Sequence, residues 1–467
     1  MRILFISNGY PPHRWAGTET YTAGIAEQLQ RRGHEITVLC AGDWEDGSQY
    51  WNGYSDDVYH QVPVRRLNFN WTRSVDPNGY LYDNPVVAAY LTRYLQEMQP
   101  DLVHVTSCET LSASVLRVAH TAGIPLVLSL TDFWFLCPRI TLLTSSRSNC
   151  DGVTTPWDCL RCQLLHQKAY RWARRFLSED ATSQLLMRVS RYPGLTRQRG
   201  LRGVGVDMSA RKAFLRQALD LPNQVLTAST FVRDTFVKNG ARTDIRLHHY
   251  GHDLSWLASY RGKTPSRLLR IGFIGQMVEE KGVHVLLEAV RLMQEDYREK
   301  FSVVVYGDLD KKPEYGNRLL QMATKTPNVE FRGIYPHDKS AEVFAEIDVL
   351  AVPSLWYDFP LIIHEAFASG TPVIASDLGS MAEVITHDVN GLLFEPDNSD
   401  DLTVQCRRII CEPTLLKRLC SGIPKVKTVD EEVDEIESLY ADLLLPKECG
   451  TSRPLTDGEP QLGRDHA

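Results

Sequence analysis

Two halves of the chain repeat one pattern, in which short runs of Val, Ile and Leu alternate with amphipathic stretches. This alternation is typical of parallel β-sheets whose neighbouring strands are joined by crossover helices. At 467 residues the chain is also too long for one ordinary hydrophobic core. We therefore predict an α/β fold of two Rossmann-like domains, each a doubly wound parallel sheet, facing a central cleft.

The expected strands follow the apolar runs. In the first half they are Arg2–Ser7, Glu35–Leu39, Leu102–Thr106, Leu126–Leu130, Gln224–Ala228 and Ile245–His248. In the second half they are Arg270–Ile274, Ser302–Tyr306, Val329–Arg332, Val349–Val352, Pro372–Ala375 and Leu392–Phe394. Gly33 is expected to end the first long helix as a left-handed cap before the second strand.

A polar, loop-like stretch divides the two predicted domains. The N-terminal domain spans 1–252, with an insert rich in basic residues and cysteine at about 137–216, and the C-terminal domain spans 253–428. A final helix is expected at about 429–445. The tail 446–467 is rich in Gly, Pro and Asp, and we expect it to be disordered.

Bulk composition is typical of a soluble globular protein, with 43% hydrophobic and 23% charged residues. The net charge of −7 gives no argument for a nucleic-acid partner, and we expect none. No apolar run is long enough to cross a bilayer, and the one after Met1 is shorter than a signal peptide needs. Ten cysteines without a secretion signal indicate a reducing compartment. We expect a cytoplasmic protein, with membrane contact left open.

The stretch 352–376, VPSLWYDFPLIIHEAFASGTPVIAS, carries the main functional signal. It is predicted to form a buried strand, a loop, a short helix and a second buried strand. Pro360 suits the helix start, where the backbone N–H groups of Leu361 and Ile362 would bind a phosphate. Glu365 follows about one turn later, and an ionised carboxylate there can accept hydrogen bonds from two sugar hydroxyls. Phosphate and sugar together indicate a nucleotide-sugar.

This stretch resembles the donor-site signature of family 4 glycosyltransferases, which have the GT-B fold and retain anomeric configuration. The matching residues are Glu365, Ala366, Gly370, Pro372, Val373 and Ile374. The usual signature begins with a further glutamate, separated from the second by seven residues. Here Asp358 takes its place with six residues between, and Tyr357 stands at the seven-residue spacing. The resemblance implies that Glu365 binds the ribose and Asp358 the donor sugar. It also implies that the final helix, at about 429–445, crosses back to the N-terminal domain.

The segment 275–282, GQMVEEKG, extends the resemblance. Lys281 matches a lysine of the family, whereas Gln276 stands where the family has arginine. The resemblance implies that Lys281 neutralises the donor diphosphate, on which negative charge builds as the sugar leaves. Gln276 would contribute hydrogen bonds without a charge. Tyr335 lies near the point where the family binds the nucleobase, and it can either stack on a base or pack internally.

The loop after the first predicted strand contains Gly17, where the family has two glycines and this chain has Ala16 and Gly17. A glycine lets the backbone approach an anion closely, so Gly17 is expected near the donor phosphate or the acceptor. The neighbouring Thr18 is a plausible cap of the helix that follows. The alternative is an ordinary turn from strand to helix.

Asp132 lies in the run 129–138, SLTDFWFLCP. The family often has a histidine just before this aspartate, close to the reacting sugar, and Thr131 replaces it here. His104, on the preceding strand, is a further candidate for the same cleft. The expected catalytic residues are therefore Asp132, Lys281 and Asp358. The resemblance also implies that the leaving phosphate can accept the acceptor's proton, so no cofactor is required for catalysis.

Four cysteines gather within 26 residues of the insert: Cys137, Cys150, Cys159 and Cys162. Four thiolates in a loop can hold a structural zinc ion in tetrahedral geometry. The gaps between them are irregular, so the alternative is a set of reduced cysteines. A catalytic metal is not expected, because no open set of Asp and His accompanies them.

The segment 168–216 is basic in an otherwise acidic chain. Its cations include Lys168, Arg171, Arg174, Arg175, Arg188, Arg191, Arg197, Arg199 and Arg202, and Tyr170, Trp172 and Phe176 are interleaved with them. A basic helix with aromatic residues can lie on an anionic membrane, which would suit a lipid-linked acceptor. A solvated helical insert is the alternative.

Taken together, these features indicate a retaining glycosyltransferase. It would move a sugar from a nucleotide-diphospho-sugar to a hydroxyl of a glycan or lipid-linked acceptor. Two alternatives remain open at this point. One is a nucleotide-sugar epimerase or phosphorylase of the same fold, and the other is a non-catalytic nucleotide-sugar-binding protein, which Gln276 and Thr131 favour.

Overall fold

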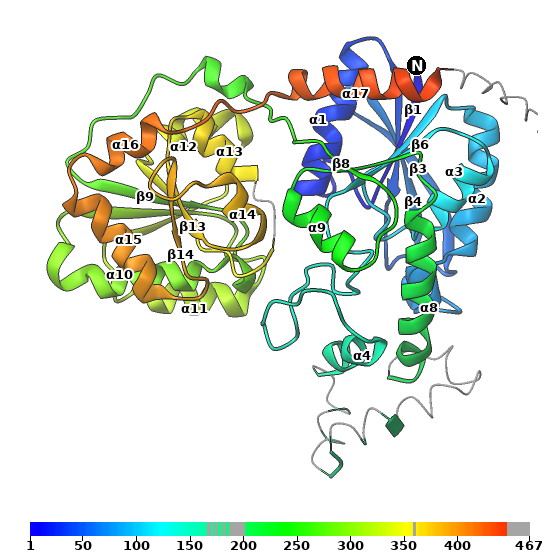
Figure 1. Ribbon diagram of the computed structural model, residues 1–467, viewed down its shortest axis with the longest axis horizontal. Helices are drawn as coiled ribbons and strands as arrows, with labels where there is room; N and C mark the ends of the chain where they lie inside the picture. The colour runs from blue at the N-terminus through cyan, green and yellow to red at the C-terminus, as the bar shows by residue number, and fades with distance from the viewer. Residues whose placement is uncertain are drawn as a thin grey trace, which may run out of the picture.

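The computed structural model describes residues 1–165, 170, 172, 176–178, 181, 184–185, 201–357 and 361–445, and of 201–207 it describes the backbone. Two α/β lobes lie side by side, and the last helix runs from the second lobe back across the first (Figure 1). Each lobe contains one sheet with helices packed around it. The expected GT-B architecture is confirmed.

The N-terminal lobe is built on an eight-stranded sheet of order β3-β4-β2-β1-β5-β6-β7-β8. All neighbouring strands are parallel except β3 and β4, which form an antiparallel hairpin. The strands are β1 (Arg2–Ser7), β2 (Glu35–Ala41), β3 (Trp51–Tyr59), β4 (Val62–Phe69), β5 (Leu102–Val105), β6 (Leu126–Leu130), β7 (Gln224–Thr227) and β8 (Ile245–Leu247). The strand order reverses between β1 and β5, which is where such folds bind ligands.

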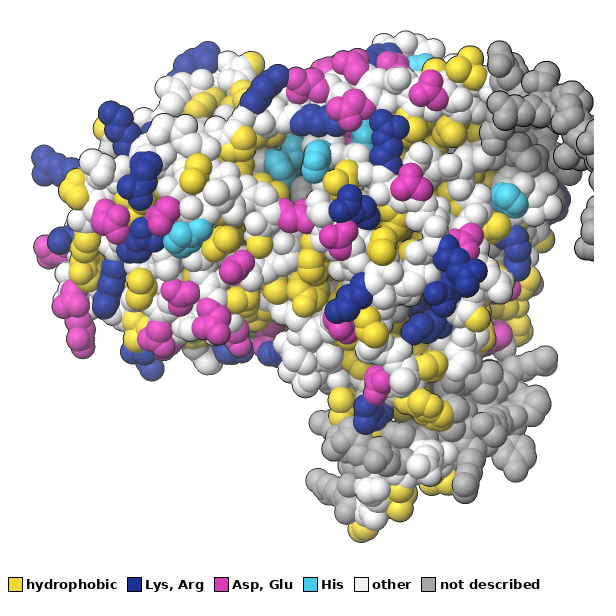
Figure 2. Space-filling view, viewed as in Figure 1, with side chains coloured by type: hydrophobic (Ala, Val, Ile, Leu, Met, Phe, Trp, Pro, Cys, Tyr) yellow, Lys and Arg dark blue, Asp and Glu magenta, His cyan; other side chains and the backbone are white. Residues whose placement is uncertain are grey.

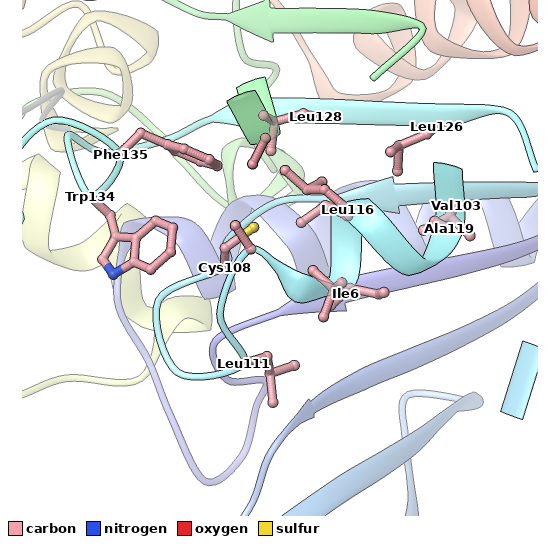
Figure 3. Packing of buried hydrophobic residues seen from close by; sticks show 14 of the residues in the cluster. Ile6, Val103, Cys108, Leu111, Leu116, Ala119, Leu126, Leu128, Trp134 and Phe135 are labelled. Atoms are coloured by element: carbon pink, nitrogen blue, oxygen red, sulfur yellow. The ribbon is translucent and has the colours of Figure 1, made fainter. Parts of the chain in front are cut away.

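Helices cover both faces of this sheet. They are α1 (Gly17–Arg31), α2 (Pro85–Met98), α3 (Ser114–Thr121), α4 (Pro156–Leu164), α8 (Leu201–Leu219) and α9 (Thr230–Lys238), with short 3₁₀ turns at Trp71–Arg73 and Gly79–Leu81. Because both faces are covered, β5 and β6 are buried along their whole length. In Figure 3 the strand residues Ile6, Val103 and Leu126 face Leu116 and Ala119 of α3, and all five are fully buried.

The C-terminal lobe has a six-stranded parallel sheet of order β11-β10-β9-β12-β13-β14, which reverses between β9 and β12. Its strands are β9 (Leu269–Ile274), β10 (Phe301–Tyr306), β11 (Val329–Gly333), β12 (Val349–Val352), β13 (Val373–Ser376) and β14 (Gly391–Phe394). Its helices are α10 (Val283–Tyr297), α11 (Pro313–Ala323), α12 (Ser340–Ala345), α13 (Leu361–Ala368), α14 (Gly379–Val384), α15 (Ser399–Cys411) and α16 (Leu415–Ser421), with 3₁₀ turns at Ser255–Ala258, Glu279–Lys281 and His337–Lys339.

Helix α17 (Val429–Leu444) ties the two lobes together. It begins with a capping box, in which Thr428 and Glu431 each bond the other's backbone N–H. Arg32, the residue just after α1, donates hydrogen bonds to Asp434 at 2.6 Å and to Glu437 at 2.7 Å. The last helix therefore packs on the N-terminal lobe although it follows the C-terminal one in sequence, as the family resemblance implies.

Two local expectations differ from the structure. The hairpin of β3 and β4 was not expected, and it extends the first sheet at one edge. Thr18 does not cap α1: the cap position is Ala16, and the Thr18 hydroxyl donates to Thr131 Oγ1 at 2.9 Å. Gly33, with φ of +88°, lies in the left-handed region just after α1, as expected.

Candidate active site

Lys281 lies beyond the carboxyl end of β9. The neighbouring strand in the sheet is β12, and the strand order reverses between these two strands. Lys281 ends a 3₁₀ turn and is followed by Gly282, whose φ is +69°. A Cβ at Gly282 would lie 1.8 Å from the Pro353 carbonyl oxygen, so only glycine lets this turn pack against the end of β12. The close approach brings Lys281 Nζ within 5.6 Å of the Trp356 ring centre in the β12 loop. The predicted diphosphate cation is thereby placed next to the predicted phosphate-binding loop.

Helix α13 begins at Leu361, just beyond the β12 loop. Its first backbone N–H groups, which include those of Leu361 and Ile362, have no partner within the helix and can bind an anion. Leu361 is half-buried and packs against the core of the N-terminal lobe, so the helix start lies at the junction of the lobes. The predicted residues Asp358 and Pro360 lie outside the described residues.

Glu365 lies one turn into α13 and is half-buried. Burial, together with the nearby carboxylate of Asp253, raises the pKa of Glu365 to about 7. Tyr335 is close by: burial raises the pKa of its phenol, and the charge of Glu365 adds to that rise. The Tyr335 ring also packs edge-on against Tyr306 at 5.2 Å. The structure thus places a carboxylate and an aromatic side chain near each other, while Gln276 is exposed at the end of β9.

On the N-terminal side, Gly17 begins α1 and is exposed. Among the described residues, a Cβ added at Gly17 would meet no atom within 4 Å, so open space lies beside this helix start. Asp132 follows β6, and its Oδ1 accepts a hydrogen bond from the Trp134 N–H at 2.8 Å. Burial raises the pKa of Asp132 to about 7, despite that hydrogen bond.

His104 does not reach the cleft. It is fully buried, with Nδ1 2.6 Å from the Tyr440 hydroxyl and Nε2 2.8 Å from the Ser129 hydroxyl. Burial lowers the pKa of its imidazole to about 3, so it is neutral at ordinary pH. Its position in the middle of β5 explains this: the histidine joins the sheet to α17 rather than facing a ligand. The expectation that His104 lies in the cleft is wrong.

Two carboxylates near Asp132 were missed from the sequence. Glu19 lies in the first turn of α1 and Glu109 lies in the loop after β5, and the charges of both act on Asp132. Glu19 is only 3% exposed. Glu109 bonds the Asn8 amide at 3.2 Å, and burial raises the pKa of its carboxyl group. The sequence could have indicated both residues through their position, because each follows a strand that flanks the switch point of the first sheet, where ligands bind.

The four cysteines of the insert are all present as free thiols. Three of the sulfurs accept backbone N–H groups: those of Arg139 on Cys137, Gly152 on Cys150 and Ser145 on Cys162. Across the described ranges, no group of three or more His, Cys, Asp or Glu side chains is arranged so that it could hold a metal ion. Structural zinc therefore stays a prediction from the sequence.

Elemental analysis tests that prediction directly. If Cys137, Cys150, Cys159 and Cys162 bind zinc, protein purified without chelator carries about one equivalent, because four thiolates complete a tetrahedral site. A Cys159→Ser/Cys162→Ser variant would then lose the metal, whereas Cys411→Ser, a change at an exposed thiol of α15, would keep it. Less than about 0.2 equivalents in the unaltered protein contradicts the prediction.

About half of the basic segment 168–216 lies outside the described residues, including Lys168 and the named arginines Arg171, Arg174, Arg175, Arg188, Arg191, Arg197 and Arg199. Tyr170, Trp172 and Phe176 are among the described residues. Tyr170 is buried against Leu160 and Leu164 of α4, whereas Trp172 and Phe176 are 64% and 71% exposed, with ring centres 5.1 Å apart. No helix in the described ranges is long and apolar enough to span a membrane.

Comparison with known proteins identifies the family. Residues 16–251 match the model of the glycosyl transferase 4-like domain, and residues 269–412 match that of glycosyl transferases group 1. Together these matches cover both lobes, and the chain belongs to the family 4 glycosyltransferases. An uncharacterized glycosyltransferase of Methanocaldococcus jannaschii is 29% identical over 419 residues, 88% of this chain and 90% of that protein. A D-inositol 3-phosphate glycosyltransferase of Streptomyces bingchenggensis is 33% identical over 168 residues, 34% of this chain and 37% of that protein.

Solved structures share the fold at low identity. HepE of Anabaena in complex with UDP has a TM-score of 0.62 and 18% identity, and the match covers 95% of this chain and all of that one. Sucrose-phosphate synthase of Thermosynechococcus elongatus has a TM-score of 0.63 and 16% identity, with 95% and 99% covered. At these identities the likeness establishes the two-lobed fold, in agreement with the sheets described above.

Proposed function

We propose that this glycosyltransferase moves a sugar from a nucleotide-diphospho-sugar to a hydroxyl of a glycan or lipid-linked acceptor, with retention of anomeric configuration. One observation carries the proposal: Lys281, the start of α13 and Glu365 follow two strands, β9 and β12, that flank the switch point of the second sheet. A cation, a set of free amides and a carboxylate in that order suit a diphosphate followed by a ribose. HepE, which shares the fold, binds UDP and UDP-glucose, which supports such a donor.

In the proposed reaction, the bond between the sugar C1 and the diphosphate oxygen breaks, and a bond from C1 to the acceptor oxygen forms on the same face. Negative charge passes to the leaving diphosphate, where Lys281 and the α13 amides stabilise it. The acceptor hydroxyl gives its proton to a phosphate oxygen of the leaving group. Asp132, which follows β6 in the other lobe and whose pKa burial raises to about 7, would orient the acceptor.

Product analysis by proton NMR tests the reaction class. The protein is incubated with nucleotide-sugars of defined anomeric configuration, such as UDP-α-glucose and GDP-α-mannose, and a panel of glycan and lipid-linked acceptors. We expect a new glycoside with the α-configuration of the donor. A β-glycoside would overturn retention, and donor binding with no turnover on any acceptor would favour the non-catalytic alternative that Gln276 and Thr131 suggest.

We further propose that the insert contacts an anionic membrane, which would suit a lipid-linked acceptor. The basic composition of 168–216 and the exposed rings of Trp172 and Phe176 support this proposal. Replacing both rings by alanine should lower binding to phosphatidylglycerol-containing vesicles by about tenfold or more, because burying each ring is worth about 2 kcal/mol.

Vesicle flotation measures this effect. Phosphatidylcholine vesicles without anionic lipid provide the charge control. A Leu320→Ala/Val404→Ala variant provides the matched control, since both side chains are exposed on helices of the other lobe. Equal flotation of the unaltered protein and the Trp172→Ala/Phe176→Ala variant would contradict membrane contact through these rings.

A further inference from the structure

A cavity of about 530 Å³ lies where the two lobes meet. Its walls come from both lobes: the insert after β6, helix α9 after β7, the loop after β12, and α14 after β13. The apolar part is lined by Leu142, Cys150, Phe231, Tyr357 and Ala382. The volume falls within the range of about 300–1,000 Å³ typical of small-molecule sites. On the face seen in Figure 2, hydrophobic side chains lie beside acidic and basic ones along the junction of the lobes.

Two aromatic rings form one wall of this cavity. Phe231 and Tyr357 lie 4.7 Å apart between ring centres with 43° between their planes, and Phe133 packs edge-on against both. Gly379 leaves room for them: its φ is +52°, and an added Cβ would lie 3.0 Å from Tyr357 and 3.3 Å from Phe231. The rings are thus held from several sides and present an apolar surface to the cavity.

Charged side chains complete the lining. Asp151 pairs with Lys238 at 3.0 Å, and Asp234 pairs with its neighbour Arg233 at 2.9 Å. The carboxylate of Glu383 accepts the backbone N–H groups of Thr230 and Phe231, across the junction between the lobes. Each carboxylate has about four lone-pair sites, so all three can accept further hydrogen bonds. Three acids against one lysine make the lining negative.

Two residues at the aromatic wall are chain neighbours of predicted site residues. Phe133, which packs on that wall, directly follows Asp132, and Tyr357 directly precedes the predicted sugar-binding residue Asp358. Among the described residues, neither Lys281 nor any residue of α13 lines the cavity, so a molecule in it would leave the proposed diphosphate site open. This position suits the acceptor rather than the donor.

We propose that this cavity binds a neutral sugar ring of the acceptor, an inference that rests on the function proposed above. A pyranose has apolar C–H faces that pack on aromatic rings, and hydroxyl edges that donate to carboxylates. The aromatic wall and the three acids offer both kinds of contact. The excess of acids disfavours a uronic acid or other anionic sugar. The acceptor is therefore a glycan, or a lipid-linked glycan, with a neutral sugar near its reacting end.

Saturation-transfer NMR on the full chain, without donor, tests the inference. The probes are methyl glycosides of glucose, galactose and mannose, the disaccharides maltose and cellobiose, and methyl glucuronide as the anionic comparison. We expect saturation of at least one neutral probe and at least about threefold weaker binding of the glucuronide. Ala382→Trp, which fills the cavity, should weaken the neutral probe by about tenfold or more, while Ser266→Trp, at an exposed residue remote from the cavity, should not.

A second variant keeps the inference testable if Ala382→Trp does not fold. Asp234→Ala changes a carboxylate that is 63% exposed, and it should weaken the neutral probe about 3- to 10-fold through the lost hydrogen bond. Binding of no neutral probe, equal binding of the glucuronide, or unchanged binding in both variants would overturn the inference. Nucleotide-sugar binding is measured separately by thermal shift. If no nucleotide-sugar binds while the neutral saccharide still does, the proposed donor is contradicted and the proposed sugar site is not.

Discussion

Replacing Lys281 by alanine should lower kcat/KM for glycosyl transfer by about 10²- to 10³-fold, the usual effect of removing one group that stabilises transition-state charge. The reason is the position of its ammonium group, which Gly282 and the tight contact with Pro353 bring to the loop before α13. Charge on the β-phosphate is greatest as the sugar leaves, so the loss should appear more strongly in kcat than in the dissociation constant of the donor. Initial-rate kinetics with a radiolabelled donor measures both.

Two further variants sharpen this test. Lys281→Arg keeps the charge and should retain a substantial part of the activity. Lys417→Ala removes an exposed lysine of α16, at the far end of the C-terminal lobe, and should have no effect. Equal losses in Lys281→Ala and Lys417→Ala, or full activity of Lys281→Ala, would show that Lys281 does not act on the diphosphate.

Replacing Glu365 by glutamine should weaken donor binding by about 10- to 100-fold, and should abolish the thermal shift produced by the matching nucleotide-sugar. An ionised carboxylate accepts hydrogen bonds from both ribose hydroxyls, and bonds to charged groups are worth about 1.5–3 kcal/mol each. Glutamine offers one carbonyl oxygen and places N–H groups at the other position. Glu295→Gln, a change at an exposed residue of α10, is the matched control and should retain the full shift.

The raised pKa of Glu365, about 7, predicts a pH dependence for the same binding step. The ionised carboxylate is the acceptor form, so binding should be strongest above pH 7 and should weaken as the pH falls through 7 and the group takes up a proton. The nucleotide diphosphate alone, titrated by calorimetry between pH 5.5 and 8.5, reports this profile. A flat profile in the unaltered protein, or the same slope in Glu365→Gln, would contradict the assignment.

Most strands and their order of appearance could be predicted because they are short apolar runs, and those in the middle of each sheet are buried on both faces. β5 and β6, for example, are buried at every position, and they coincide with the predicted runs to within a residue. The β3–β4 hairpin could not be predicted in this way. Most of β3 faces solvent, and its turn places His60 and Gln61 at φ of +46° and +70°, positions that usually carry Asn or Gly.

The donor side of the site could be predicted from local sequence because its residues follow two strands within a few positions. The N-terminal side depends on contacts between distant segments. Thr18 bonds Thr131, 113 positions away, and His104 bonds Tyr440, 336 positions away. Contacts between residues so far apart cannot be predicted from local residue spacing. For this reason a helix cap was expected at Thr18 and a histidine in the cleft at His104. Glu19 and Glu109 were missed because their charges act on Asp132 from other segments, although each follows a strand that flanks the switch point of the first sheet.

Tyr357 shows how tertiary context decides a motif position. It stands at the spacing where the family signature has its first glutamate, yet its ring packs against Phe231 and Phe133 of the other lobe. A glutamate could not make these aromatic contacts. The departure from the signature at this position therefore coincides with a contact between the lobes.

A crystal structure with the matching nucleoside diphosphate tests the central claim most directly. We predict that the diphosphate lies between Lys281 Nζ and the backbone N–H groups of Leu361 and Ile362, at hydrogen-bond distance, with the ribose hydroxyls on Glu365. A nucleotide bound elsewhere, or bound with Lys281 and the start of α13 pointing away from its phosphates, would contradict the account.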